Sequence, residues 1–131
     1  MRAEMELGAD LRAPYLARRW VASLRPPLST DRSDRLEWLV AELVTASVKH
    51  AMQAGRHGSL DLSFLAEDGV VRVEVTDPGR SRPPVVPEEP DDVTGFGFYL
   101  LDRMADRWGF TEGPLPGLWF EMDVYGLSAS G

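Results

Sequence analysis

The stretch from Leu36 to Ala51 constrains the fold more than any other part of the sequence. Its apolar side chains recur every three or four residues, at Leu36, Leu39, Val40, Leu43, Val44, Val48 and Ala51. This spacing is typical of a helix with one buried face. We therefore expect a long central helix over residues 30–54, packed against the core by that face.

A row of other side chains follows one border of the buried face. Successive residues of a helix are about 100° apart. Glu42, Ala46, Lys49 and Gln53 therefore lie together on one flank, with His50 at its edge. A polar row beside the core is in a position to contact a bound ligand. The simpler alternative is a core helix with a charged margin and no ligand.

Alternation of apolar and polar residues predicts several strands. The clearest segments are residues 60–66, 70–77 and 118–125, and the weaker ones are residues 2–7 and 110–112. Asp68 and Gly69 lie between the first two, and an Asp-Gly turn favours a hairpin there. Two more helices are expected, over residues 10–24 and 97–108, with Gly109 as the end of the second.

Asp77 stands at the end of a predicted strand with its side chain turned inward. Because side chains alternate along a strand, Asp77 lies on the same side as Val71, Val73 and Val75, which we expect to point to the core. Burying an unpaired carboxylate is costly, so an inward Asp needs partners or a ligand that donates to it. The alternative is an Asp that caps the turn before Pro78.

The segment after Asp77 is expected to be a loop and then a helix start. Residues 79–94 are rich in proline, arginine and acidic residues, which predicts a lid or binding loop rather than a helix or central strand. Gly95 and Gly97 precede the next helix, where small residues and free N–H groups favour contact with phosphate. Residues 126–131 are expected to form a flexible tail.

Composition narrows the class of protein. The 131 residues fit one domain. A net charge of −7 argues against a nucleic-acid binder. No apolar run approaches the ~20 residues of a membrane-spanning helix. The absence of cysteine suits the cytoplasm, which is the location that we expect.

Three motifs occur in an order that resembles a known ATP-binding fold. They are Glu-Leu-Val-Thr-Ala-Ser-Val-Lys-His-Ala at residues 42–51, Asp77-Pro-Gly79, and Gly95-Phe-Gly97. The chain resembles the GHKL superfamily of gyrase and histidine kinases, and most of all its short anti-sigma-factor serine kinases. The resemblance implies a single histidine-kinase-like domain over residues 1–131. It would be a two-layer α/β (α+β) sandwich with a mixed, largely antiparallel sheet and three helices on one face.

The resemblance also implies where a nucleotide would bind. Glu42 matches the residue that orients or activates the attacking hydroxyl or water, and Asp77 matches the residue that contacts the adenine. Further nucleotide contacts are implied for Gly79, Gly95, Gly97, Phe98, Lys49 and His50. The expected cofactor is ATP, held under the lid formed by residues 79–94.

Departures from the family pattern affect the expected chemistry. Ala46 occupies the position of an Asn whose oxygen binds Mg²⁺, and alanine has no ligand atom. Gly117 stands where a Thr often helps to hold the adenine. We therefore expect weak ATP binding, no metal ligand at position 46, and impaired serine/threonine kinase or ATPase activity. The need for Mg²⁺ stays open.

The resemblance implies protein partners as well. Short members of this type bind a sigma factor and exchange it for an anti-anti-sigma protein, which they phosphorylate. We expect one or both of these partners, no nucleic acid and no membrane, and a homodimer stays open. The alternative is a degenerate interaction module that keeps the fold and binds nucleotide weakly or not at all. An enzyme unrelated to ATP has little support, because no Ser-His-acid set or nucleophile-elbow motif occurs.

Overall fold

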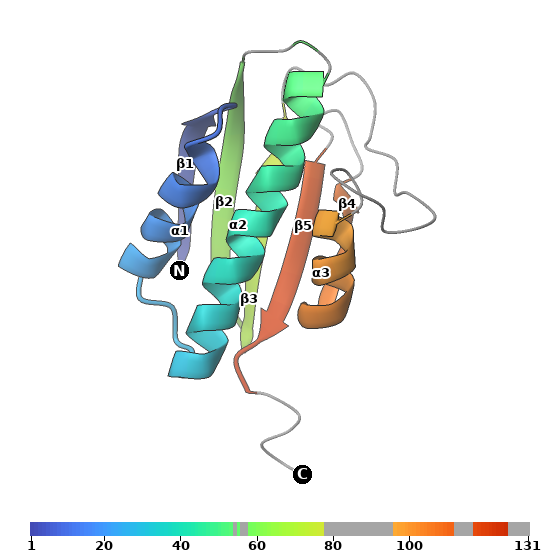
Figure 1. Ribbon diagram of the computed structural model, residues 1–131. Coiled ribbons are helices and arrows are strands. Elements are labelled where there is room, and N and C mark those ends of the chain that lie inside the picture. The colour runs from blue at the N-terminus through green and yellow to red at the C-terminus, as the bar shows by residue number, and fades with distance from the viewer. Residues whose placement is uncertain (54, 56–57, 78–95, 112–116, 126–131) are drawn as a thin grey trace.

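The computed structural model describes residues 1–53, 55, 58–77, 96–111 and 117–125, with residues 96–99 described by their main chain only. A five-stranded sheet forms one layer, in the order β1-β2-β3-β5-β4 (Figure 1). The strands are β1 (Arg2–Gly8), β2 (Ser59–Glu67), β3 (Val70–Thr76), β4 (Arg107–Thr111) and β5 (Gly117–Asp123). All four strand pairs are antiparallel, so the described residues show no parallel pair of the mixed sheet that we expected.

Three helices form the second layer and cover one face of the sheet (Figure 1). They are α1 (Ala13–Ser23), α2 (Thr30–Gln53) and α3 (Phe96–Met104). The long α2 lies between the other two and packs against both. The predicted α+β sandwich is therefore confirmed. No described helix is both long enough and apolar enough to cross a membrane.

The core lies between α2 and the sheet, as the helical spacing predicts. All seven apolar residues of the predicted face of α2 are buried. They meet side chains from the central strands, of which Phe64 and Phe120 are the largest fully buried ones. Burial of a Leu or Phe side chain contributes about 1.5–3 kcal/mol, so this contact supplies much of the stability.

The predicted hairpin of β2 and β3 is present and has the expected turn. Asp68 and Gly69 have φ values of 54° and 76°. Two successive positive φ angles are the signature of the type I′ turn, whose twist matches that of two paired strands. The strands then pair without interruption from Glu67–Val70 to Asp61–Thr76.

The prediction of a third helix that continues to Trp108 is wrong. α3 ends at Met104, and residues 107–111 form the edge strand β4. Trp108 pairs with Phe120 of β5, and Gly109, expected as the helix end, pairs with Trp119. The helical spacing of Leu101, Met104 and Trp108 misled the prediction, because pairing with β5 decides the conformation here.

Other boundaries differ by a few residues. α1 begins at Ala13 rather than at residue 10, because the Asp10 carboxylate accepts a hydrogen bond from the Arg12 N–H at 2.8 Å and forms a turn before the helix. β4 begins three residues before the predicted strand. The predicted lid of residues 79–94 and the tail of residues 126–131 lie outside the described residues.

An ion network on the open face of the sheet joins β3, β4 and β5 around Glu121. Its carboxylate accepts hydrogen bonds from Arg107 Nε at 2.7 Å and from Arg72 Nη1 at 3.2 Å. The Arg72 guanidinium also lies 4.2 Å from the centroid of the Trp119 ring. Partial burial raises the pKa of Glu121, but the two arginines outweigh that effect, so the net pKa is lowered.

Candidate functional site

The predicted row on α2 lies at the border of the core. Glu42, Lys49 and His50 are half-buried, and Ala46 is buried with 6% of its surface exposed. Ala46 is one helical turn from Glu42. This part of α2 therefore carries charged groups around one buried methyl group, as the spacing predicts.

Glu42 and Lys49 interact through their charges. Partial burial raises the pKa of the Glu42 carboxyl, and the positive charge of Lys49 opposes that shift. The net pKa of Glu42 is above its ordinary value. A carboxyl of this kind is better suited to exchange protons near neutral pH than one that is fully solvated.

Asp77 follows the last residue of β3 and is buried, with 5% of its surface exposed. The predicted inward orientation explains this burial, because Val71, Val73 and Val75 on the same side of the strand are also buried. Asp77 takes part in an interaction within the protein. Its carboxylate is an acceptor held at the end of a central strand, close to the point where Thr76 pairs with Gly117.

Gly117 is required by the close approach of β5 to β3. A Cβ atom on this residue would lie 2.1 Å from the Val75 carbonyl oxygen. No side chain fits there, so the threonine that we expected at this position in related proteins has no room in this backbone. A contact between adenine and a side chain at position 117 is excluded for the same reason.

The phosphate end of the predicted site is only partly described. Gly97 and Phe98 lie within α3, whose first residue is Phe96. Gly79 and Gly95 lie outside the described residues. The structure thus gives positions for the α2 row and for Asp77, and it gives the main chain at the start of α3.

Asp77 and Lys49 supply polar groups that a nucleotide can contact, whereas Ala46 supplies none for a metal ion. The Asp77 carboxylate is an acceptor for an amino group such as that of adenine, and Lys49 supplies positive charge for phosphate. A magnesium ion needs oxygen ligands, and the methyl group of Ala46 offers none. In the part of the chain that the structure describes, no group of three or more His, Asp or Glu side chains is arranged to hold a metal ion.

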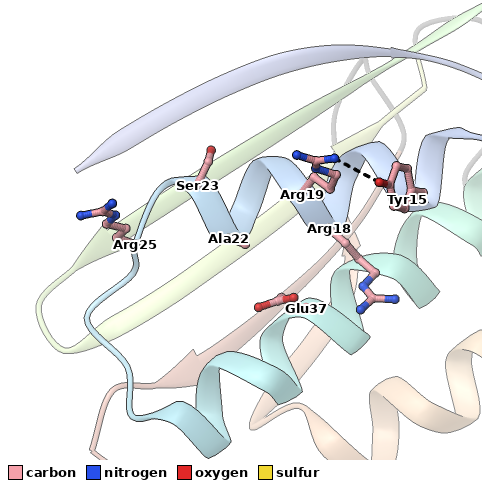
Figure 2. A pocket seen from close by; sticks show the side chains of 7 residues that line it. All are labelled: Tyr15, Arg18, Arg19, Ala22, Ser23, Arg25 and Glu37. Carbon is pink, nitrogen blue, oxygen red and sulfur yellow. Dashed lines mark hydrogen bonds between the residues drawn. The ribbon is translucent and has the colours of Figure 1, made fainter.

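A second candidate surface lies between α1 and α2 and was not predicted. A hollow of about 460 Å³ is lined by Tyr15, Arg18, Arg19, Ala22, Ser23, Arg25 and Glu37 (Figure 2). A second hollow of about 340 Å³ is lined by Arg18, Asp34, Glu37, Trp38, Ala41 and Glu42. Arg18 and Glu37 line both, so the two hollows adjoin. We call them together the α1–α2 groove.

The sequence contained part of the signal for this groove. Tyr15, Arg18, Arg19 and Ala22 follow the helical spacing of one face of α1, and Arg18 and Arg19 are exposed, as expected. The sequence alone did not show that this face adjoins Trp38 and Glu42 of α2. That neighbourhood depends on how the two helices pack.

Comparison with known proteins agrees with the fold and the order of the elements. Residues 7–117 match the family model of the histidine kinase-like ATPase domain, so the chain belongs to this family. It is similar to the anti-sigma F factor of Geobacillus stearothermophilus, with 29% identity over 121 residues and 82% of each chain covered. It is also similar to the anti-sigma F factor of Geobacillus kaustophilus, with 28% identity and the same coverage.

Proposed function

We propose that the chain is an anti-sigma regulator of the histidine kinase-like ATPase family, working in the cytoplasm. It would bind a sigma factor and release it to an anti-anti-sigma protein. Two of its relatives carry the name anti-sigma F factor, and each alignment covers 82% of both chains. That coverage supports a common mode of action, since no large part of either protein is left out.

The nucleotide site of this regulator would bind ATP weakly and transfer phosphate poorly. The observation that carries this proposal is the side chain at position 46. Ala46 is buried in the row between Glu42 and Lys49, where a metal-binding member of the family would need an oxygen. Phosphoryl transfer depends on metal and positioned charge, so a missing metal ligand reduces catalysis more than binding.

Each residue of the site has a role that its chemistry supports. Asp77 would accept a hydrogen bond from the adenine amino group. Lys49 would offset part of the phosphate charge, and His50 and the start of α3 would border the phosphates. Glu42 would orient a hydroxyl or a water molecule, although without a metal nearby that role contributes little to the rate.

The test of the regulatory role is direct binding. Each sigma factor of the organism that supplies the chain is immobilised in turn, and binding of the purified chain is measured with and without ATP. We expect one sigma factor to bind and its transcription in vitro to be inhibited. The proposal is abandoned if no sigma factor binds the chain under either condition.

A second candidate function is an interaction module that needs no nucleotide. The same missing oxygen at position 46 favours it. The two functions are separated by comparing sigma-factor binding by the wild type and by Asp77→Asn. A loss of ATP-dependent binding in the variant supports the nucleotide-linked switch, whereas identical binding with and without ATP in both proteins supports the module.

A further inference from the structure

The α1–α2 groove has opposite charges at its two ends. The hollow around Tyr15 contains three arginines, Arg18, Arg19 and Arg25, with one acidic residue, Glu37. The hollow around Trp38 contains three carboxylates, from Asp34, Glu37 and Glu42, with one arginine, Arg18. A basic end in a chain of net charge −7 is a local feature that the overall charge does not explain.

Each end of the groove also exposes one large aromatic side chain. Tyr15 is 58% exposed and Trp38 is 55% exposed, whereas the core aromatic side chains of Phe64 and Phe120 are fully buried. Tyr15 is held in place by Arg19, whose Nη1 donates to the tyrosine oxygen at 3.1 Å. Exposed Trp, Tyr and Arg side chains are the types that contribute most to protein interfaces.

The groove charges are available to a partner. Within the described part of the chain, Arg18, Arg25 and Glu37 make no ion pair. Figure 2 shows Arg18 extending from α1 toward α2, and Arg25 beyond the end of α1. Arg25 has a φ of 51°, in the left-handed region that residues other than Gly, Asn and Asp rarely adopt. The turn that carries its charge to the groove is therefore strained.

We propose that the α1–α2 groove binds a helical segment of a partner protein with acidic residues in its first turns, apolar residues along one face and a basic residue in its last turn. The acidic residues pair with Arg19 and Arg25, and the basic side chain lies over Trp38 among the three carboxylates. An apolar face across Tyr15, Ala22 and Ala41 completes the contact. This charge order also follows the dipole of the partner helix, which favours acids at its start and bases at its end.

This inference rests on the proposed function, because it names the surface on which the regulator receives a protein partner. The groove also reaches Glu42, so a segment bound there contacts the same side chain that borders the candidate nucleotide site. Partner binding and nucleotide binding are therefore expected to influence each other.

The test uses three fluorescein-labelled helical peptides with the same leucine face. The first has glutamates in its first half and two arginines in its last turn, the second has glutamate at all charged positions, and the third has arginine at all charged positions. Fluorescence anisotropy with the full chain measures the three dissociation constants. We expect the first peptide to bind at least about tenfold more tightly than the other two, the range of one good interface residue.

Variants of the chain locate the binding. Trp38→Ala and Arg19→Glu are expected to weaken binding of the first peptide about tenfold, whereas Arg2→Glu, an exposed change on β1, leaves it unchanged. Arg25→Gly separates binding from stability. Glycine adopts the positive φ of residue 25 without strain, so this variant is expected to have a higher Tm, yet it should bind the first peptide more weakly because the Arg25 charge is lost. The proposal is overturned if all three peptides bind equally or if none shows saturable binding. It is also overturned if these variants leave binding of the first peptide unchanged.

Sigma-factor binding by the same variants distinguishes the role of the groove from the anti-sigma function. If a sigma factor binds the wild type and the Trp38→Ala and Arg25→Gly variants equally, the groove proposal is wrong and the anti-sigma function stands. If the first peptide binds in the groove while no sigma factor binds the chain, the anti-sigma function is wrong and the groove remains an interaction surface.

Discussion

Replacement of Gly117 by alanine is expected to destabilise the protein through a single steric contact. The added Cβ would lie 2.1 Å from the Val75 carbonyl oxygen and 3.0 Å from the Thr76 Cα. Real Cβ atoms essentially never approach another heavy atom within 3.0 Å, so β3 and β5 must separate by about 1 Å at this pair. Glycine here is needed for space, since its φ does not lie in the left-handed region.

The loss of folding stability in Gly117→Ala follows from two opposing effects. Inserting a carbon into a packed site costs about 1–3 kcal/mol. Replacing glycine by alanine also restricts the unfolded chain, which stabilises the fold by about 0.4–1 kcal/mol where the backbone permits it. The net loss is therefore about 1–2 kcal/mol. For a domain of this size that loss lowers Tm by roughly 3–10 °C.

Gly58→Ala is the matched control. No atom of the described residues lies within 4 Å of a Cβ built on Gly58, and its φ is not in the left-handed region. This variant carries the same unfolded-state effect without the steric cost, so it should be neutral or slightly stabilising. Urea and thermal unfolding, followed by circular dichroism, measure both variants. Equal stability of the two alanine variants would refute the claim that β5 needs glycine at this point.

Two further predictions concern carboxyl groups whose pKa values are shifted. Burial raises the pKa of Glu42 against the opposing charge of Lys49, so ionisation of Glu42 destabilises the folded protein as pH rises through the folded pKa. Glu42→Gln should therefore be more stable than the wild type at neutral pH, and the difference should vanish in acid. Urea unfolding measured over a range of pH would contradict this prediction if it showed no such trend. Burial raises the pKa of Glu121, but Arg107 and Arg72 together lower it by more, so the charged carboxylate stabilises the fold above the unfolded pKa, and this stabilisation is lost as pH falls through the folded pKa. Glu121→Gln should therefore be less stable than the wild type at neutral pH but not in strong acid. An equal loss of stability at every pH would count against the ion network.

Much of the fold follows from local patterns in the sequence. The face of α2 was predicted from its spacing, because one long element with a regular period leaves few alternatives. The turn at Asp68-Gly69 fixed the hairpin of β2 and β3. Asp77 was placed inward by counting from Val75, since side chains alternate along a strand.

The errors lie where two elements compete or meet. Met104 and Trp108 fit a helical period, but pairing of Trp108 with Phe120 decides in favour of a strand, and that partner is distant in the sequence. The close contact of Gly117 with Val75 could not be predicted for the same reason. The α1–α2 groove needs the packing of two helices, so the spacing of either helix alone did not reveal it.

The candidate nucleotide site on α2 has no metal ligand at position 46, where the side chain is the methyl group of Ala46. Isothermal calorimetry of ATP binding, with and without Mg²⁺, measures the effect of this missing ligand in the wild type, Ala46→Asn and Asp77→Asn. We expect weak binding by the wild type that Mg²⁺ barely changes, a further loss in Asp77→Asn, and a Mg²⁺-dependent gain of about 5- to 150-fold in Ala46→Asn. Tight, Mg²⁺-dependent binding by the wild type would contradict this expectation, as would a site that neither substitution affects.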